Sequence, residues 1–254
     1  MNRLYSRRTL VRSMIAGASS LAVAGCDRIG NSSAGRTLLY SAEGLTYRAQ
    51  RLITNRNALA REFSLSDLSP VFRTNGNTMP AAPEYQRHLS ERFVNWRLVV
   101  DGSVDAPVRV SLADLLRLPQ RTQITRHDCV EGWSAIGQWT GVAMKVLLDA
   151  ARPRPSARYV VLHCADDFRG TMYYESIDMV DAYHPQTILA HSLNGQRLPV
   201  GNGAPLRLRV ERQLGYKQAK YVMRLQLVDS LKDIGAGRGG YWEDKIGYEW
   251  YAGI

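Results

Sequence analysis

Cysteine is scarce in this chain, which has three among 254 residues. Three cysteines cannot form the disulfide framework that stabilises small secreted domains. Glycine (21) and proline (10) are too few for a collagen-like or disordered chain. No run of about 18 uninterrupted apolar residues occurs, so no transmembrane helix is expected. The remaining composition, 45% hydrophobic and 22% charged, is that of a globular protein long enough to bury a sizeable core.

Runs of positive charge are lacking too, although the formal net charge is +10. Four arginines and no acidic residue lie in the first 25 positions. Without them, 29 basic residues face 23 acidic ones, an excess of six. The other arginines are scattered among acidic residues and form no basic stripe with flanking aromatic rings. The pattern argues against a nucleic-acid partner and suits an anionic cofactor or substrate.

The first 25 residues predict an export signal that is not part of the fold. A basic segment, residues 1–12, precedes a small and mildly apolar one, residues 13–25. The sequence SRRTLV at 6–11 resembles a twin-arginine signal, whose pathway exports folded proteins. A plain Sec signal is the alternative. Because proteins exported folded commonly receive a cofactor in the cytoplasm, this signal directs attention to a cofactor site.

A lipid anchor is expected directly after this signal. The segment VAGC at 23–26 resembles a lipobox, in which the cysteine becomes the lipidated first residue of the mature chain. A chance cysteine is the alternative. Acyl chains on Cys26 would tether the protein to a membrane surface, with residues 26–39 as a short flexible tether. We therefore expect a periplasmic protein, lipid-anchored through Cys26.

Residues 40–254 show no fixed repeat, low-complexity segment or linker and are interpreted as one mixed α and β domain. Its N-terminal extension, residues 40–95, has helical spacing over 40–63 and an irregular, proline-containing segment over 64–95. The main domain is expected over 96–254, with a C-terminal wrap. The expected strands are 96–100, 108–110, 124–128, 159–163, 206–210 and 221–228. The expected helices lie near 111–118, 142–150 and 176–182.

The most informative segment is RHDCVEGWS at 126–134, where a strand-like run ends in Cys129. From the residues alone, three interpretations stay open. Cys129 could be a buried hydrophobic residue or a disulfide partner of Cys164. It could be a nucleophile paired with His127, although nothing obvious supplies a third, orienting group. It could also be a soft thiolate ligand for a redox metal.

Several separated motifs then occur in one order: CVEGWS at 129–134, QWTG at 138–141, NGAPLR at 202–207, and GYK at 215–217 followed by Lys220. Together they resemble the molybdopterin-binding domain of the sulfite oxidase superfamily, over about residues 72–228. The resemblance implies an α+β, sulfite-oxidase-type fold of mixed sheets with surrounding helices. It also implies a Mo-molybdopterin cofactor whose molybdenum is held by the pterin dithiolene and by Cys129. The chain is similar to bacterial periplasmic members with the catalytic domain alone, such as methionine sulfoxide reductase catalytic subunits.

The resemblance also implies the cofactor contacts. They are Asn75, Thr78, Met79, Cys164, Asn202, Arg207, Lys217, Gln218, Ala219 and Lys220. Arg207, Lys217 and Lys220 would supply positive charge to the phosphate of the cofactor. A solvated face is the alternative for the two lysines, and an Asn-Gly turn is the alternative for Asn202. The family's Arg-Asn-His loop motif reads TNG at 74–76 here, which departs from the family pattern.

Catalytic candidates surround the expected metal ligand. His127 and Glu131 flank Cys129 and are predicted, with it, as the catalytic group. Asp128, Trp133, Asp166 and Asp167 are further residues that could line a substrate funnel. The tail over 239–251 is dense in aromatic and acidic residues. It is interpreted as a wrap that buries its rings against the domain, with covering the pocket or docking an electron carrier as the alternative.

The sequence therefore predicts a molybdenum-dependent periplasmic oxidoreductase. Its reaction would be a two-electron one, an oxygen-atom transfer with a small oxyanion or sulfoxide-type substrate. No cluster of arginine and tyrosine for an oxyanion can be identified by motif, which weakens sulfite as the substrate. No haem segment or Cys-x-x-Cys-His motif is found, so we expect electrons to be exchanged with a separate cytochrome or membrane haem protein. The alternative is a non-catalytic molybdopterin-binding or assembly protein, against which the intact Cys129 argues.

Overall fold

The computed structural model describes residues 32–254 and divides the chain into two compact units, one ending at Thr54 and one spanning Asn55–Ile254. The predicted export signal, the predicted anchor Cys26 and positions 27–31 of the predicted tether lie outside the described residues. Among the helices of the described part, none is long and apolar enough to cross a membrane.

Helix α2, Ser33–Ile53, makes up most of the described part of the first unit. The Ser32 hydroxyl caps its start by accepting a hydrogen bond from the Gly35 N–H at 3.0 Å. Residues 33–39, predicted as part of a flexible tether, are therefore helical. The helix predicted over 40–63 is present but starts earlier and ends at Ile53.

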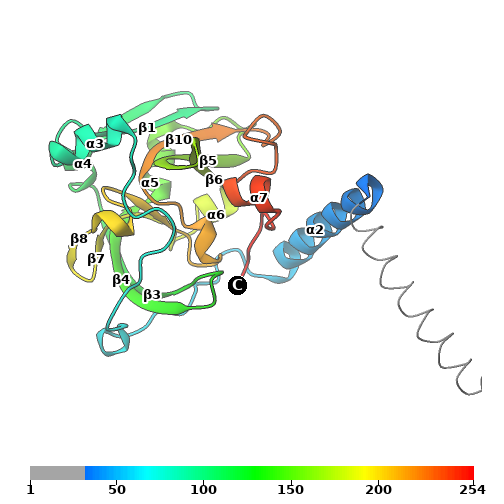
Figure 1. Ribbon diagram of the computed structural model, residues 1–254, viewed down its shortest axis with the longest axis horizontal. Coiled ribbons are helices and arrows are strands. Elements are labelled where there is room, and N and C mark those ends of the chain that lie inside the picture. Colours follow the sequence, from blue (N-terminus) through cyan, green and yellow to red (C-terminus); the bar gives the residue numbers. More distant parts are fainter. Residues whose placement is uncertain (1–31) are drawn as a thin grey trace, which may run out of the picture. The chain divides into compact units, whose positions relative to one another are not determined.

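The second unit contains two five-stranded sheets (Figure 1). The first has the order β2-β1-β10-β5-β6, with β1 and β10 parallel and the other pairs antiparallel. Its strands are β1 Arg97–Gly102, β2 Val108–Ser111, β5 Tyr159–Phe168, β6 Thr171–Asp178 and β10 Val222–Val228. The second has the order β3-β4-β7-β8, and β9 also pairs with β7. Its strands are β3 Gln120–Asp128, β4 Ser134–Ala143, β7 Ile188–Leu193, β8 Gln196–Arg197 and β9 Arg207–Arg209.

Short helices connect and cover these strands. They are α3 Pro83–Ser90, α4 Leu112–Leu115, α5 Met144–Ala151, α6 Met179–Ala182, α7 Tyr241–Ile246 and the 3-10 turns η1 Leu65–Asp67, η2 Val200–Asn202 and η3 Gly215–Lys217. The main core joins both sheets, because Leu98 and Leu225 of the first sheet and Leu189 of the second belong to one buried cluster. A smaller cluster surrounds Trp139 of β4 and is closed by Phe72. The predicted α+β class with mixed sheets is confirmed.

The β3–β4 hairpin positions Cys129. The two strands pair continuously from Gln120↔Val142 to Asp128↔Ser134, so residues 129–133 form the loop at the hairpin end. The loop is closed by hydrogen bonds from the Cys129 N–H to the Trp133 carbonyl at 2.9 Å and from the Gly132 N–H to the Cys129 carbonyl at 3.0 Å. Gly132 has φ +87°, a conformation that favours glycine.

Several predicted boundaries differ from the structure. The compact unit starts at Asn55 instead of residue 96, because the segment 64–95 packs into it. That segment also contains α3, for which Pro83 provides the first helical position. The helix predicted near 176–182 starts only at Met179, because β6 continues to Asp178.

Candidate functional site

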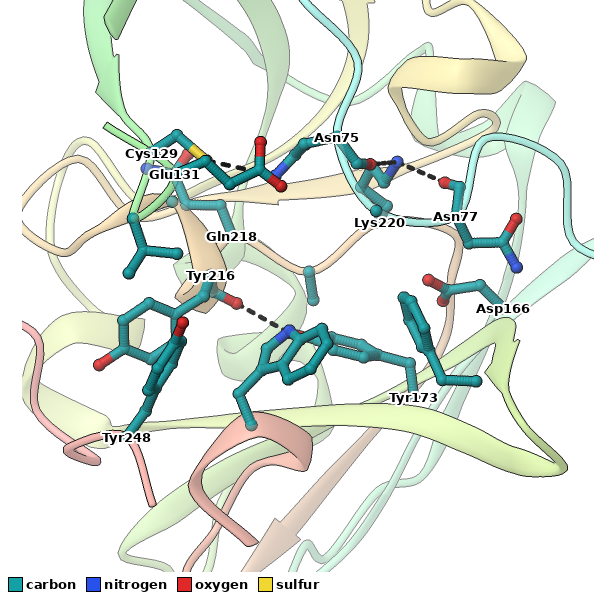
Figure 2. A pocket seen from close by; sticks show the side chains of 16 residues that line it. Asn75, Asn77, Cys129, Glu131, Asp166, Tyr173, Tyr216, Gln218, Lys220 and Tyr248 are labelled. Carbon is teal, nitrogen blue, oxygen red and sulfur yellow. Dashed lines mark hydrogen bonds between the residues drawn. The ribbon is translucent and has the colours of Figure 1, made fainter. Parts of the chain in front are cut away.

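A cavity lies at the end of the β3–β4 hairpin (Figure 2). Its wall is built from five places in the chain: the loop 75–77, the hairpin loop 129–131, the β5–β6 hairpin, the segment 215–220 and the C-terminal tail. The cavity therefore brings together residues that are up to 173 positions apart, from Asn75 to Tyr248.

Cys129 is on this cavity wall and is 7% exposed. Its thiol is free, and the Asn75 side-chain amide donates to Sγ at 3.7 Å. Burial raises the pKa of the thiol, and the charge of Glu131 adds to this. Because Cys164 is also free, the disulfide interpretation of these two cysteines is wrong in this structure. Cys129 thus presents a single sulfur atom to the cavity.

Asn75 and Lys220 are held together beside Cys129. The Lys220 ammonium donates to the carbonyls of Asn75 and Asn77 at 2.6 Å each, and to that of Gly201 at 3.0 Å. An ammonium has three N–H groups, so all of its donors are used. Burial and the charge of Arg207 lower the pKa of Lys220 to about 8. Lys220 therefore fixes the loop 75–77 and has no donor left for a ligand in this arrangement.

Arg207 and Arg209 on β9 stack on Trp139, with guanidinium carbons 4.9 and 4.5 Å from its ring centroid. Arg209 forms a buried ion pair with Glu211, with distances of 3.0 and 2.6 Å. Arg207 is 2% exposed and donates only to the carbonyls of Asn202 and Gln218, at 3.1 and 3.3 Å. Among residues 32–254, no carboxylate pairs with Arg207 and its Nε has no hydrogen-bond partner. Burial and the neighbouring Arg209 lower its pKa to about 9.

Asn202 lies next to this uncompensated charge. It is in η2, is 6% exposed, and its side-chain Nδ2 has no hydrogen-bond partner within the described chain. Neither Asn202 nor Arg207 lines the cavity. They lie behind two residues that line the cavity, Gln218 and Lys220. The two unsatisfied donors make this the part of the structure best suited to an anionic group.

The side chain of Lys217 does not have the predicted role of a phosphate clamp. It is fully buried, and its ammonium forms ion pairs with Glu175 and with Glu243, the latter at 2.7 Å. These two carboxylates compensate its charge and raise its pKa against the effect of burial. Through these two ion pairs Lys217 links η3 to β6 and to α7. Its neighbours Gln218 and Ala219, which the resemblance predicts as cofactor contacts, line the cavity.

Three other predicted contacts are not on the cavity wall. Cys164 on β5 is 4% exposed and belongs to the main core. Thr78 is exposed and Met79 is 50% exposed, and both follow the part of the loop that faces the cavity. The structure gives no cavity contact to these three side chains, because the chain turns away after Asn77, whose side chain accepts from the Met79 N–H at 2.9 Å.

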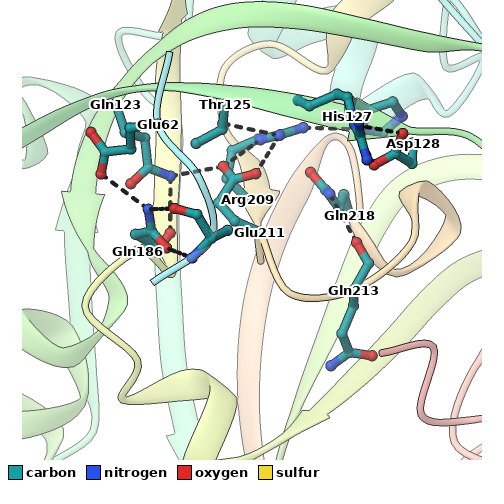
Figure 3. A network of polar contacts seen from close by, with 12 residues as sticks. Glu62, Gln123, Thr125, His127, Asp128, Gln186, Arg209, Glu211, Gln213 and Gln218 are labelled. Carbon is teal, nitrogen blue, oxygen red and sulfur yellow. Dashed lines mark hydrogen bonds and ion pairs between the residues drawn. The ribbon is translucent and has the colours of Figure 1, made fainter. Parts of the chain in front are cut away.

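His127 is also away from the cavity. It is 1% exposed, and its Nδ1 accepts from Arg209 at 3.0 Å within a buried polar network (Figure 3). Its ring packs on Trp133, with centroids 5.4 Å apart. Burial and the charge of Arg209 lower the pKa of His127 well below the ordinary value, so it stays neutral. The interpretation of His127 as a catalytic base for Cys129 is not supported by these contacts.

Glu131 is exposed and lines the cavity, where its carboxylate accepts from the Trp133 indole N–H at 2.9 Å. Of the predicted catalytic residues, Cys129 and Glu131 are thus brought together at the cavity.

An aromatic wall of the cavity faces Cys129 and Glu131. The sequence did not predict this wall as part of the site. Its members are Phe168, Tyr173, Tyr216, Trp242 and Tyr248. Trp242 and Tyr248 belong to the C-terminal tail, so the tail both buries its rings and covers the pocket.

Comparisons with known proteins show the family of this chain. The sequence profile described as "Oxidoreductase molybdopterin binding domain" matches residues 85–233, which is more than half of the chain. The chain is 46% identical over 159 residues to the protein named "Putative protein-methionine-sulfoxide reductase subunit YedZ1" of Azospira oryzae, covering 63% of this chain and 56% of that protein. It is 37% identical over 145 residues to the protein-methionine-sulfoxide reductase catalytic subunit MsrP of Ralstonia nicotianae, covering 53% and 44%.

A solved structure is also similar. The sulfane dehydrogenase SoxCD from Paracoccus pantotrophus matches with a TM-score of 0.50 and 26% identity, over 54% of this chain and 39% of that chain. The chain spans about half the length of the curated relatives it matches. The predicted resemblance and fold are confirmed.

Proposed function

The chain belongs to the oxidoreductase molybdopterin binding domain family, and on that premise we propose that it is a Mo-molybdopterin enzyme that reduces a sulfoxide. The relatives named as protein-methionine-sulfoxide reductase subunits support the substrate class. The proposal concerns the cavity that the free thiol of Cys129 lines, and behind whose wall Arg207 is buried without a carboxylate partner in the described part of the chain.

The residues present fit this cofactor. An anionic phosphate suits the unpaired guanidinium of Arg207 and the free amide donor of Asn202. A soft metal suits the thiol of Cys129, whose raised pKa would fall once a metal binds the thiolate. When bound, the cofactor supplies a metal centre that exchanges two electrons with the substrate.

The residues of the chain bind and orient. Cys129 would supply the protein ligand, and Asn75 would hold its sulfur through the contact of 3.7 Å. Lys220 would keep the loop 75–77 closed over the cofactor. The aromatic wall would exclude water from the substrate and pack against its apolar groups.

The observation that carries the choice of substrate is the charge of the cavity wall. Lys220 is its only cationic lining residue in the described chain, and all three of its N–H groups are bound to carbonyls. Glu131 and Asp166 are acidic lining residues. A doubly charged oxyanion such as sulfite would meet no free cation there, whereas a neutral sulfoxide would pay no such penalty. The reaction consumes two electrons and two protons and converts the sulfoxide into a thioether and water.

Electrons are proposed to come from a separate carrier, a cytochrome or membrane haem protein. The twin-arginine-like sequence at 6–11 and the lipobox-like sequence ending in Cys26 support a periplasmic, lipid-anchored protein. Export of the protein in a folded state is compatible with insertion of the cofactor before export.

The test uses the full chain purified with its cofactor and a reduced dye as electron donor. We expect oxidation of the dye by a methionine sulfoxide peptide, and no reduction of an acceptor dye by sulfite. Cys129→Ser should abolish turnover, because a hydroxyl is a poor soft-metal ligand. Cys164→Ser, the matched change of the other described cysteine, should keep it.

The opposite pattern, sulfite turnover without sulfoxide turnover, would refute the substrate assignment. Full molybdenum content without turnover of either substrate would instead support a non-catalytic binding protein. Unchanged turnover in Cys129→Ser would refute metal ligation by this residue.

A further inference from the structure

Three fully buried charged side chains meet behind the aromatic wall of the cavity. The Lys217 ammonium contacts Oε1 of Glu175 and, at 2.7 Å, Oε1 of Glu243, and none of the three side chains is exposed. These three residues are called the Lys217 cluster below. The Oε2 atoms of both glutamates have no hydrogen-bond partner in the described chain. The cluster therefore contains more acceptor atoms and more carboxyl groups than its single ammonium satisfies.

Each member of the cluster is carried by a segment that also carries a member of the aromatic wall. The pairs are Glu175 with Tyr173 on β6, Lys217 with Tyr216 on η3, and Glu243 with Trp242 on α7. The last two pairs are adjacent in sequence, and the first is two residues apart on a strand, so its side chains are on one face. The Tyr173 hydroxyl also donates to the Tyr216 carbonyl at 2.7 Å (Figure 2). A shift of the cluster would therefore move three rings that line the cavity.

The C-terminal tail packs closely on the two carboxyl groups. A Cβ atom added at Gly240 would lie 2.6 Å from Oε1 of Glu175 and closer still to Oε2 of Glu243, so only a glycine fits there without a shift of the carboxyl groups. The Lys217 ammonium is also 5.4 Å from the ring centroid of Trp250. Because the tail carries part of the aromatic wall, the cluster decides how closely that part of the wall is held.

The charges of the cluster balance only when the two carboxyl groups retain one proton. With both ionised, one ammonium would face two negative charges in a fully buried site. Burial and repulsion by Glu243 raise the pKa of Glu175 well above the ordinary value, although Lys217 and the Ser176 N–H oppose this. At neutral pH the cluster therefore holds one ammonium, one carboxylate and one neutral carboxyl group.

The other titratable groups around Glu175 do not replace that proton. Tyr173 and Tyr174 precede it on β6 and Cys164 faces it from β5, and burial raises the pKa of each of these groups. They are neutral at pH 7 and add no charge. Asp244 of α7 accepts from the hydroxyl of Tyr174. None of these groups brings a positive charge to the cluster.

We propose that the Lys217 cluster is a positioning device for the substrate, which holds the aromatic wall against the apolar groups of a sulfoxide only while its two carboxyl groups share one proton. Loss of this proton leaves two like charges in a buried site, and the tail moves outward to let water reach them. The wall then loses contact with the substrate, whereas Cys129 keeps its place because it belongs to the β3–β4 hairpin. This inference rests on the proposed function, since it requires a sulfoxide in this cavity.

The decisive variant is Glu175→Gln, whose amide is a neutral counterpart of the protonated carboxyl group and cannot ionise. Its matched control is Glu249→Gln, the same change at an exposed glutamate of the same tail. Full-length holoprotein of each is assayed with a reduced dye and a methionine sulfoxide peptide between about pH 7 and pH 10. The KM of the wild type and of the control should rise about tenfold more over this range than the KM of Glu175→Gln, because aromatic contacts with the substrate are lost. The kcat values should show no such difference.

Lys220 also loses its proton in this range, because its pKa is lowered to about 8. Its contribution remains in Glu175→Gln, so comparison of that variant with the wild type removes it. Dimethyl sulfoxide gives a second comparison, since its two methyl groups offer little surface to the aromatic wall. Its KM should depend on pH in the same way in the wild type and in Glu175→Gln.

Hydrogen exchange of the tail gives a readout that does not depend on turnover. The backbone amides of residues 236–250 should exchange faster in the wild type than in Glu175→Gln at the same alkaline pH, because the tail is released. Glu243→Gln also leaves a single ionisable carboxyl group beside Lys217 and should behave like Glu175→Gln. A circular dichroism melt of each variant checks that it is folded.

Equal pH dependence of the peptide KM and of tail exchange in the wild type and Glu175→Gln would overturn the inference. An equally large effect on dimethyl sulfoxide would overturn the positioning role, because the proton would then act on the reaction and not on the wall. A wild type that turns over no sulfoxide would refute the proposed function, whereas tail exchange would still show whether a proton in the cluster holds the tail. The two failures are therefore distinguishable.

Discussion

Arg207 and Arg209 offer a matched pair for testing whether the protein holds an anion. Both are on β9, both are buried, and both stack on Trp139. They differ in their partners, since Arg209 forms an ion pair with Glu211 and no carboxylate of the described chain forms one with Arg207. The perturbation is Arg207→Met, with Arg209→Met as its control.

The magnitude follows from the burial of the charge. The lowering of the Arg207 pKa to about 9 corresponds to about 5 kcal/mol of unfavourable charge burial. Because the folded-state pKa of this cation is lowered, the penalty is fully present below about pH 9 and fades as the pH rises toward the ordinary pKa of arginine. Methionine removes the penalty but loses two hydrogen bonds of about 1 kcal/mol each and a cation–π contact of about 1 kcal/mol. Cofactor-free Arg207→Met should therefore be about 2 kcal/mol more stable than the wild type.

Arg209→Met should instead lower the stability of the cofactor-free protein. It leaves the buried Glu211 without its ion-pair partner, with only the Gln123 amide donating to it at 2.8 Å, which costs about 3–5 kcal/mol. With cofactor bound, Arg207→Met loses a charge-assisted contact of about 2–4 kcal/mol, equivalent to about 30-fold to 1000-fold weaker retention at 1.4 kcal/mol per tenfold. Arg207→Met should thus be more stable than the wild type without cofactor and less able to hold molybdenum.

The assay compares denaturant unfolding of cofactor-free protein with the molybdenum content of protein purified from a cofactor-producing host. Arg207→Lys should restore retention only in part, because an ammonium lacks the planar fork of a guanidinium. The reasoning fails if Arg207→Met destabilises the empty protein as much as Arg209→Met does and still purifies with full molybdenum.

Two further predictions concern other parts of the chain. Lys217→Met should cost about 3–5 kcal/mol of unfolding free energy, because Glu175 and Glu243 are left buried without a cation. Its folded fraction should still retain molybdenum, and a stable variant without molybdenum would reinstate Lys217 as a phosphate ligand. Changing Arg7 and Arg8 together to Lys should leave unprocessed precursor in the cytoplasm, detected by immunoblot of cell fractions. Efficient processing of that double variant would indicate a Sec substrate.

Local signals predicted the centre of the site well. Cys129 could be placed at a strand end because a strand pattern and a glycine-containing loop are adjacent in the sequence. Gln218 and Ala219 followed from a short motif and do line the cavity. Strand β4 was missed although Ala135, Gly137 and Trp139 alternate inward along it, because that segment was interpreted only as a motif.

Other residues could not be placed from the sequence because their environment depends on distant parts of the chain. Lys217 resembles a cofactor ligand until its partners are known, and these lie 42 and 26 positions away, at Glu175 and Glu243. Asp166 faces the cavity because of a strand irregularity that no residue pattern announces. Aromatic density in the tail was visible, but only the fold shows that Trp242 and Tyr248 reach the cavity.

The empty protein carries several polar groups that it does not satisfy by itself. The Nε atom of Arg207 and the Nδ2 atom of Asn202 lack acceptors, and the Oδ1 atom of Asp166 lacks a donor, within the described chain, so each adds a cost to the folded state. A ligand that satisfies them binds only the folded chain, and its binding free energy is added to the stability of the fold. Loading with cofactor and completion of the fold should therefore be coupled. If the chain is exported folded, as proposed above, the export pathway would then favour the loaded form, since that form is the more stable one.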